Sequence, residues 1–208
     1  TWGNMASDRV PNPLPVRRLI TDLIDMSKDS QDEQMLTLAG DEDAPEYVRH
    51  TLAVSSLSIL IGAAVGLSDA SLSDLGVAAM FHGVGYTKSG AGGDVENQEH
   101  PMEAARLLLK QRGFHEAKVR RLLVALQHHL DFVHQPQPSL FARIVRIAKD
   151  YDTLTRHRED GPLMVPPDAI SLMAGAGGIF YDPALLQIFV NKLGPYPPGS
   201  LVVLSDGR

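Results

Sequence analysis

The chain has 208 residues, of which 44% are hydrophobic, and it contains no cysteine. This length suffices for one sizeable hydrophobic core, and the lack of cysteine excludes disulfides and thiolate ligands, so any metal must be held by histidine and carboxylate side chains. The 19 basic and 25 acidic residues give a formal net charge of -6, which disfavours nucleic acid as a partner but allows a local basic pocket for a small anionic ligand.

No uninterrupted apolar run reaches the roughly 18 residues that a membrane span requires. The N-terminus also lacks a basic stretch followed by an apolar one, the pattern of a secretory leader. We therefore predict a cytoplasmic protein with no membrane partner.

Residues 1–16 are predicted to lie outside the fold. Pro11, Pro13 and Pro15 alternate in this segment, and proline is incompatible with a helix interior because it lacks a backbone N–H. We expect an extended arm or an expression remnant here, and we assign residues 17–208 to a single domain.

The rest of the chain follows a helical pattern. Apolar residues recur at helical spacing in residues 17–26, 45–66, 101–109, 119–129, 140–154 and 183–190, and a further short helix follows Pro166. Residues 75–82 are apolar almost all round, which is typical of a buried central helix. No alternating run is long enough for a sheet, so we predict an all-α fold in which only the tail at residues 201–204 is extended.

Histidines supply the candidate metal ligands. Glu46 and His50 are four residues apart on one predicted helix and share a face, although an ordinary surface pair is the alternative. His82 closes the buried helix, where an imidazole needs a partner. That partner is either a metal ion or, as the alternative, a hydrogen-bonding group of the core. His128 and His129 point about 100° apart on a helix, yet at its end both can reach an ion in a cleft.

The other four histidines fall at or beyond helix ends. His100 stands just before the helix predicted from residue 101. His115, His134 and His157 lie in polar or loop segments, and we predict that they are on the surface.

The order of these segments resembles the HD-GYP family. The similarity runs through residues 46–54, 75–85, His100-Pro101, His128-His129 and 142–155, and the run from Tyr181 to Ser205 is similar to the family's last segment. The resemblance implies an HD-GYP-like helical domain that hydrolyses cyclic di-GMP with two or three iron or manganese ions, which activate water for attack. The ligands that it implies in this chain are Glu46, His50, His82, His100, His128 and His129, with one Asp after His82 and another on the helix at 142–155.

Several positions depart from the family's pattern. Gly83 stands where the metal-bridging Asp belongs, and Lys149 stands where the second metal-binding Asp belongs. Asp150 is a poor substitute because a shift of one residue turns a side chain about 100° around the helix. Tyr86 replaces a phosphate-contacting Lys, and the Gly-Tyr-Pro loop that should follow His129 is missing.

These departures predict at most one divalent ion, of iron, manganese, zinc or nickel, or none. The preferred ligands are His100, His128 and His129, a three-imidazole set that leaves a coordination position open. We also predict that the ammonium of Lys149 replaces the missing ion near His50 and His82 and pairs with Glu46; extension into solvent is the alternative.

Three functions remain open. The first is a catalytically inactive signalling module that binds cyclic di-GMP or a partner protein such as a diguanylate cyclase. The others are a residual single-metal phosphodiesterase and a structural interaction domain of a larger regulator. Arg143, Arg146 and Arg156 are candidate contacts for ligand phosphates, although a solvated helix face is the alternative.

Overall fold

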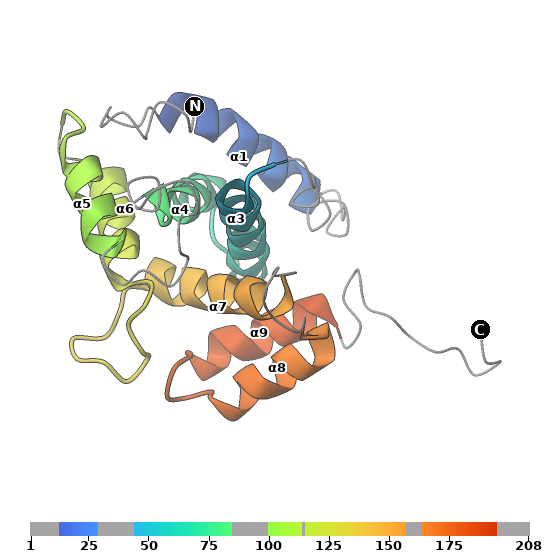
Figure 1. Ribbon diagram of the computed structural model, residues 1–208. Coiled ribbons are helices and arrows are strands. Elements are labelled where there is room, and N and C mark those ends of the chain that lie inside the picture. The colour runs from blue at the N-terminus through green and yellow to red at the C-terminus, as the bar shows by residue number, and fades with distance from the viewer. Residues whose placement is uncertain (1–12, 29–43, 85–99, 114, 157–163, 195–208) are drawn as a thin grey trace.

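The computed structural model describes residues 13–28, 44–84, 100–113, 115–156 and 164–194 (Figure 1). Within these ranges the chain is helical and contains no strand, so the predicted all-α fold is confirmed; the tail at residues 201–204 lies outside them. The helices are α1 (Pro13–Lys28), α3 (Glu46–Val65), α4 (Asp69–Phe81), α5 (His100–Leu109), α6 (Glu116–Gln127), α7 (Leu140–Thr155), α8 (Pro166–Gly175) and α9 (Pro183–Leu193).

Helix α3 is the centre of the fold. It contacts α1, α4, α7 and α9, and it is buried along most of its length. Its length and hydropathy would also suit a membrane span, but most of its apolar stretch is buried inside the protein, as in the core helix of a globular domain. The helix ends at Gly66, whose φ of 86° is the left-handed conformation that glycine adopts without strain.

Helices α1, α3 and α4 meet closely at Gly76 of α4. A Cβ atom at this position would lie 2.8 Å from Ile20 Cγ2 on α1 and 3.0 Å from Ile59 Cδ1 on α3. The hydroxyl of Ser55 on α3 donates to the Gly76 carbonyl at 3.0 Å, so the polar group at this contact is satisfied. A residue without a side chain is therefore part of how these three helices pack.

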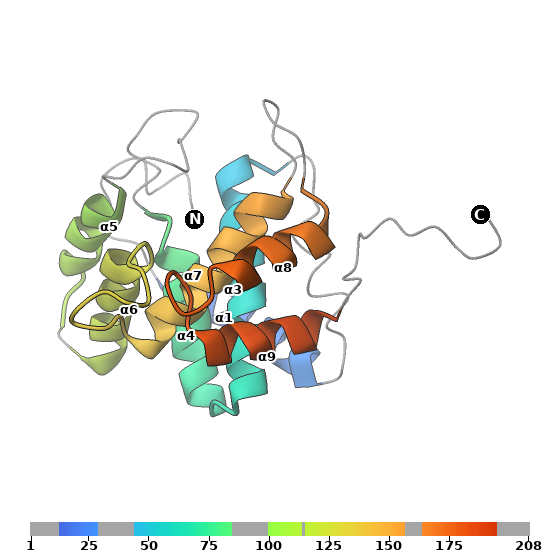
Figure 2. The ribbon, with the colours of Figure 1, turned by 90° about the horizontal axis from the view of Figure 1, so that it is seen from below.

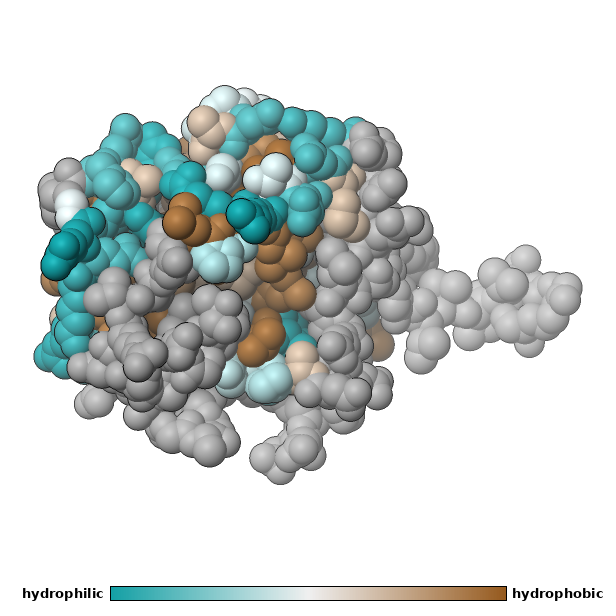
Figure 3. Space-filling model, turned by 90° about the horizontal axis from the view of Figure 1, so that it is seen from above, coloured by the Kyte–Doolittle hydropathy of each residue, from teal (hydrophilic) through white to brown (hydrophobic). Residues whose placement is uncertain are grey.

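Helix α1 covers one end of α4 with Ile20, Leu23 and Ile24. Figure 3 shows the face on the α1 side of the molecule, where hydrophilic side chains surround a hydrophobic area. Leu14 and Leu19 are large hydrophobic side chains that α1 leaves exposed.

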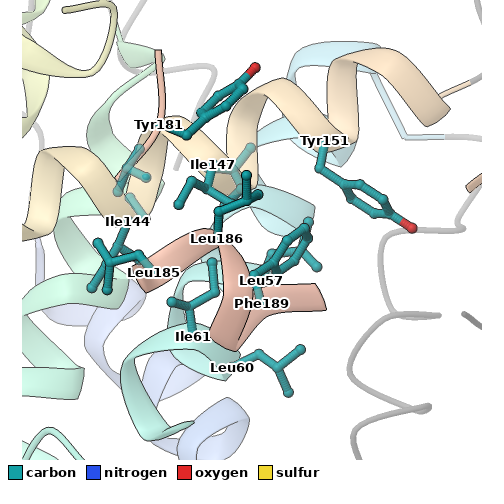
Figure 4. Close-up of a cluster of buried hydrophobic side chains, with 14 of the residues drawn as sticks. Leu57, Leu60, Ile61, Ile144, Ile147, Tyr151, Tyr181, Leu185, Leu186 and Phe189 are labelled. Carbon is teal, nitrogen blue, oxygen red and sulfur yellow. The ribbon is translucent and has the colours of Figure 1, made fainter. Parts of the chain in front are cut away.

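Helices α7 and α9 contact α3 on the side away from α1 (Figure 1), and α8 packs against α7 and α9 (Figure 2). A cluster of buried side chains joins α3, α7 and α9, and the Tyr151 ring packs edge-on against Phe189 at 5.1 Å. This cluster holds α7 beside α3. Its labelled members in Figure 4 are Leu57, Leu60, Ile61, Ile144, Ile147, Tyr151, Tyr181, Leu185, Leu186 and Phe189.

Helices α5 and α6 form a hairpin closed by a buried lysine. Lys118 Nζ donates to the carbonyls of Leu109, Gln111 and Gly113 at 3.1, 2.5 and 3.2 Å. These carbonyls at the end of α5 have no acceptor role within the helix, and the ammonium of α6 satisfies them. The hairpin brings the first residue of α5 beside the last turn of α6.

Two predicted boundaries were wrong. Residues 13–16 form the first turn of α1 instead of an extended arm, and Val16 is buried. Proline is tolerated there because the first N–H groups of a helix have no intrahelical acceptor; residues 1–12 lie outside the described ranges. Helix α4 begins at Asp69 instead of near residue 75, because Ser68 caps it by accepting from the Ser71 N–H.

We expect the substitution Gly76→Ala to destabilise the protein by about 1–3 kcal/mol, because the added methyl displaces Ile20 and Ile59. Urea unfolding would measure the change. The control is Gly175→Ala, where nothing lies within 4 Å of the new Cβ and the change should be neutral or slightly stabilising. Equal losses in the two variants would contradict the close contact at Gly76.

We expect Lys118→Met to cost about 1–3 kcal/mol, because it leaves three main-chain carbonyls, of which that of Gln111 is buried, without their donor. The free energy of unfolding in urea measures this cost. Arg112→Met, which changes an exposed residue of the same turn, should be within about 0.5 kcal/mol of wild type. A Lys118→Met protein as stable as wild type would show that water replaces the ammonium.

Candidate metal centre

Five histidines from four helices form one contiguous cluster. His50 comes from α3, His82 follows α4, His100 begins α5, and His128 and His129 follow α6. The ring centroids are 5.3 Å apart for His50 and His82, 5.1 Å for His82 and His128, and 4.9 Å for His100 and His129. The sequence pointed to these five residues as ligands, and the structure brings them together.

Main-chain carbonyls orient two of the buried rings. His82 Nδ1 lies 2.5 Å from the Ala79 carbonyl, and His128 Nδ1 lies 3.0 Å from the carbonyls of both Val124 and Ala125. A carbonyl only accepts hydrogen bonds, so Nδ1 carries the proton and Nε2 of the neutral ring keeps its lone pair. Histidines that bind metal are typically oriented in this way.

His100, His128 and His129 have the spacing of ligands to one ion. His100 Nε2 lies 3.0 Å from His128 Nε2 and 3.2 Å from His129 Nε2, and the three donor atoms lie within 4.8 Å of one another. Two nitrogens bound at about 2.1 Å to one ion in tetrahedral geometry are separated by roughly 3.4 Å, which is close to the two shorter separations in this set. The three-imidazole set therefore fits a single metal ion.

The environment keeps these rings neutral. Burial, followed by the neighbouring imidazoles, lowers the pKa of His82 and of His128 well below the ordinary value. Burial and the positive charge of Lys149 lower the pKa of the partly exposed His129 to about 3. The neutral imidazole is the form that binds a metal, so the site is ready for an ion without losing protons near neutral pH.

Lys149 lies at the edge of the cluster, but its partner differs from the predicted one. Its Nζ lies 2.7 Å from Asp150 Oδ1 and 3.4 Å from His129 Nδ1, and its side chain is only 12% exposed. The predicted pair with Glu46 is wrong, and so is the alternative of extension into solvent. Asp150 is adjacent in sequence and reaches the ammonium first, while the aliphatic part of the lysine is buried against the cluster.

Glu46 does not join the histidines. Its carboxylate pairs with Arg49 at 2.5 Å and with Arg156 at 3.4 Å. Arg156 also forms a two-pronged pair with Asp152, at 2.5 and 2.9 Å. We expected Glu46 and His50 to bind one ion because they share a face of the helix. Arg49 and Arg156 instead pair with the Glu46 carboxylate and hold it away from the histidines.

The carboxylate of Asp150 is also fully used. It accepts from Arg146 at 3.1 Å and from the Tyr181 hydroxyl at 3.0 Å, in addition to its pair with Lys149. Burial and the charge of Asp150 raise the pKa of Tyr181 above its ordinary value, so the phenol stays protonated. Among the described residues, no carboxylate near the cluster lacks a cation of its own.

The three arginines predicted to contact phosphate are paired inside the protein. Arg143 bonds to Asp182 at 2.5 Å, and Arg156 bonds to Asp152. Arg146 bonds to the His129 carbonyl and pairs with Asp131 at 3.1 Å. The geometry therefore gives these arginines structural partners, and their role with a ligand remains only a prediction.

The loop that follows His129 is tied to the connection between α8 and α9. The N–H groups of Phe132 and Val133 donate to the carbonyls of Phe180 and Ile179, both at 3.2 Å. A neighbouring segment therefore supports the loop that follows His129, and the absence of a Gly-Tyr-Pro segment there stays a prediction from the resemblance. Gly83 is buried directly after His82, whereas Tyr86 lies outside the described residues.

Sequence reasoning missed Asp152 as part of the site. Its buried carboxylate accepts from His50 Nδ1 at 2.6 Å. Burial raises the pKa of Asp152, but the hydrogen bonds and charges of His50 and Arg156 outweigh it and hold the pKa below the ordinary value. The sequence did contain a signal for Asp152, since it is an aspartate on the apolar face of α7 and lies four residues before an arginine. The predicted surface positions of His115 and His134 are confirmed, and His157 lies outside the described residues.

Among the described residues, five imidazoles form one cluster in a helical domain, and three of them, His100, His128 and His129, could hold a metal ion. The HD domain family model matches residues 47–154, just over half of the chain. A cyclic di-GMP phosphodiesterase of Pseudomonas aeruginosa is 31% identical over 194 residues, which cover 84% of this chain and 46% of that protein. The chain therefore belongs to the HD domain family, the HD-GYP-like resemblance is confirmed, and the chain spans less than half of that relative's length.

We expect Lys149→Met to raise the zinc affinity of the metal-free protein about tenfold, because a positive charge beside His129 opposes a bound cation. Competition with a chromophoric chelator would measure the affinity. The control is Arg112→Met. It removes a charge beyond the end of α5 opposite His100 and should leave the zinc affinity unchanged. An unchanged affinity in Lys149→Met would show that the ammonium moves away when the ion binds.

The metal-free protein should lose stability when the pH falls below about 6.5. Because the folded-state pKa values of His82, His128 and His129 are lowered, the unfolded chain binds protons that the folded rings reject, and the free energy of unfolding decreases. Above that pH the three rings are neutral in both the folded and the unfolded protein, so their contribution to the free energy of unfolding is constant. Urea unfolding between about pH 7.5 and about pH 5.5, roughly one pH unit on either side of 6.5, measures the slope. His128→Gln should reduce it, whereas His134→Gln, at an exposed residue, should not.

Proposed function

We propose that this chain is a metal-binding module of cyclic di-GMP signalling that binds the nucleotide without efficient hydrolysis. The observation that carries the proposal is the donor set: three imidazole Nε2 atoms at the spacing of one ion, among carboxylates that already have cations. The nucleotide is proposed from the similarity to the phosphodiesterase of Pseudomonas aeruginosa.

The ligand chemistry favours one ion of zinc, iron or nickel. Imidazole suits these metals, whereas manganese prefers carboxylate oxygens. His100, His128 and His129 would hold the ion, and the ion would supply a Lewis acid that can polarise a phosphoryl oxygen. The carbonyls of α6 fix the His128 ring, and the partial exposure of His129 provides access from solvent.

Charge argues against efficient hydrolysis. Two dications held close together need negatively charged ligands, and Glu46, Asp150 and Asp152 are each paired with an arginine or lysine. Lys149 adds a further positive charge at the edge of the cluster. Gly83 offers no side chain that could bridge two ions.

A single-metal phosphodiesterase is the second candidate. The three-histidine set supports it, because catalytic metal sites commonly combine three protein ligands with an open position for water or substrate. This candidate shares the metal site with the first proposal and differs only in turnover.

Metal content tests both candidates. Protein purified without chelator should contain about one ion per chain, and His128→Ala should lose it, whereas the control His134→Ala should retain it. Two or more ions per chain in the wild type would overturn the single-ion site.

Calorimetry and turnover with cyclic di-GMP then separate the candidates. We expect binding heat without detectable hydrolysis. Hydrolysis that disappears in His128→Ala would establish the second candidate in place of the first. No heat at high micromolar nucleotide would overturn the nucleotide-binding proposal.

A further inference from the structure

His50 is a member of the cluster that a carboxylate holds. Its Nδ1 lies 2.6 Å from Asp152 Oδ2, and both side chains are buried, with relative exposures of 1% for His50 and 7% for Asp152. The two residues are 102 positions apart, and they join the first turns of α3 to the last turn of α7. A contact of this kind depends on how the two helices pack.

Arg156 holds the Asp152 carboxylate in place. From the residue directly after α7, its guanidinium donates to both carboxylate oxygens, at 2.5 and 2.9 Å. This two-pronged geometry restricts rotation of the carboxylate and leaves Oδ2 directed at His50. Glu46 pairs with the same arginine at 3.4 Å, and its carboxylate pairs with Arg49 instead of the His50 ring.

The hydrogen bond decides which nitrogen of His50 keeps a lone pair. An ionised carboxylate only accepts, so Nδ1 must carry the proton and Nε2 of the neutral ring is the acceptor. This Nε2 atom is buried and has no hydrogen-bond partner among the described residues. The His82 ring packs edge-on against the same imidazole, with 5.3 Å between centroids.

We infer that Asp152 is a positioning residue that fixes the tautomer of His50, so that Nε2 presents its lone pair inside the histidine cluster. Asp152 acts through His50 and does not itself reach the three-histidine set. The lone pair is then available to accept a hydrogen bond or to bind an ion there. The use of that lone pair rests on the proposed metal site, whereas the tautomer itself does not.

Long-range proton–nitrogen spectra of the metal-free full chain, labelled with nitrogen-15 at histidine, test the inference. The two neutral tautomers have distinct patterns, and the loss of one pattern in His50→Gln assigns the residue. We expect wild-type His50 to carry its proton on Nδ1. In Asp152→Ala the Nε2-protonated form, which free histidine prefers, should become the major form.

The matched control is Glu46→Gln, which removes the other carboxylate partner of Arg156 but leaves the contact between Asp152 and His50. Its spectrum should show His50 with the wild-type tautomer. If Asp152→Ala does not fold, the double variant Asp152→Ala/Arg156→Ala removes the unpaired guanidinium together with the carboxylate and serves instead. A wild-type His50 protonated on Nε2, or an unchanged tautomer in the variants without Asp152, would overturn the inference.

Adding one equivalent of zinc separates this inference from the proposed function. Zinc should shift the ring signals of His100, His128 and His129. If it shifts none of them, the proposed metal site is wrong, while the effect of Asp152 on the tautomer of His50 still stands or falls on the metal-free spectra.

Discussion

The structure depends on the burial of several imidazoles side by side in one interior. A buried imidazole is tolerated when it is neutral and one nitrogen has an acceptor, and this protein supplies that acceptor from helix-end carbonyls for His82 and His128 and from Asp152 for His50. Because Nδ1 of each of these rings carries the proton, each Nε2 atom keeps its lone pair in the interior of the protein. A cation is the natural complement to that arrangement.

The charges around the cluster follow from the same constraint. Carboxylates that could have served as ligands instead meet arginine or lysine side chains: Glu46 with Arg49, Asp150 with Lys149, and Asp152 with Arg156. Each pair lowers the cost of burying its own charge. The consequence is a metal position lined by neutral donors, which distinguishes the proposed single-ion module from a site that holds two dications.

Much of this protein was predictable from local patterns. Helical periodicity and capping residues predicted most of the elements, because a helix depends mainly on neighbours three or four residues away. The histidines were recognisable for a related reason, since His82 closes an apolar helix and His128 and His129 are adjacent at a helix end. The first turn of α1 was missed because proline breaks a helix interior but is compatible with a helix start.

The sequence by itself determined the all-α fold and identified the imidazoles that cluster in it, and the loss of a bridging carboxylate at Gly83 stays a prediction. Only the tertiary structure decided which distant groups meet: Arg156 draws Glu46 away from the histidines, and Asp152 orients His50. The physical reason is the separation along the chain over which each kind of interaction acts. Helix formation is set within one or two turns of chain, whereas ion pairs and ring orientations depend on a few ångströms between helices that lie up to a hundred residues apart.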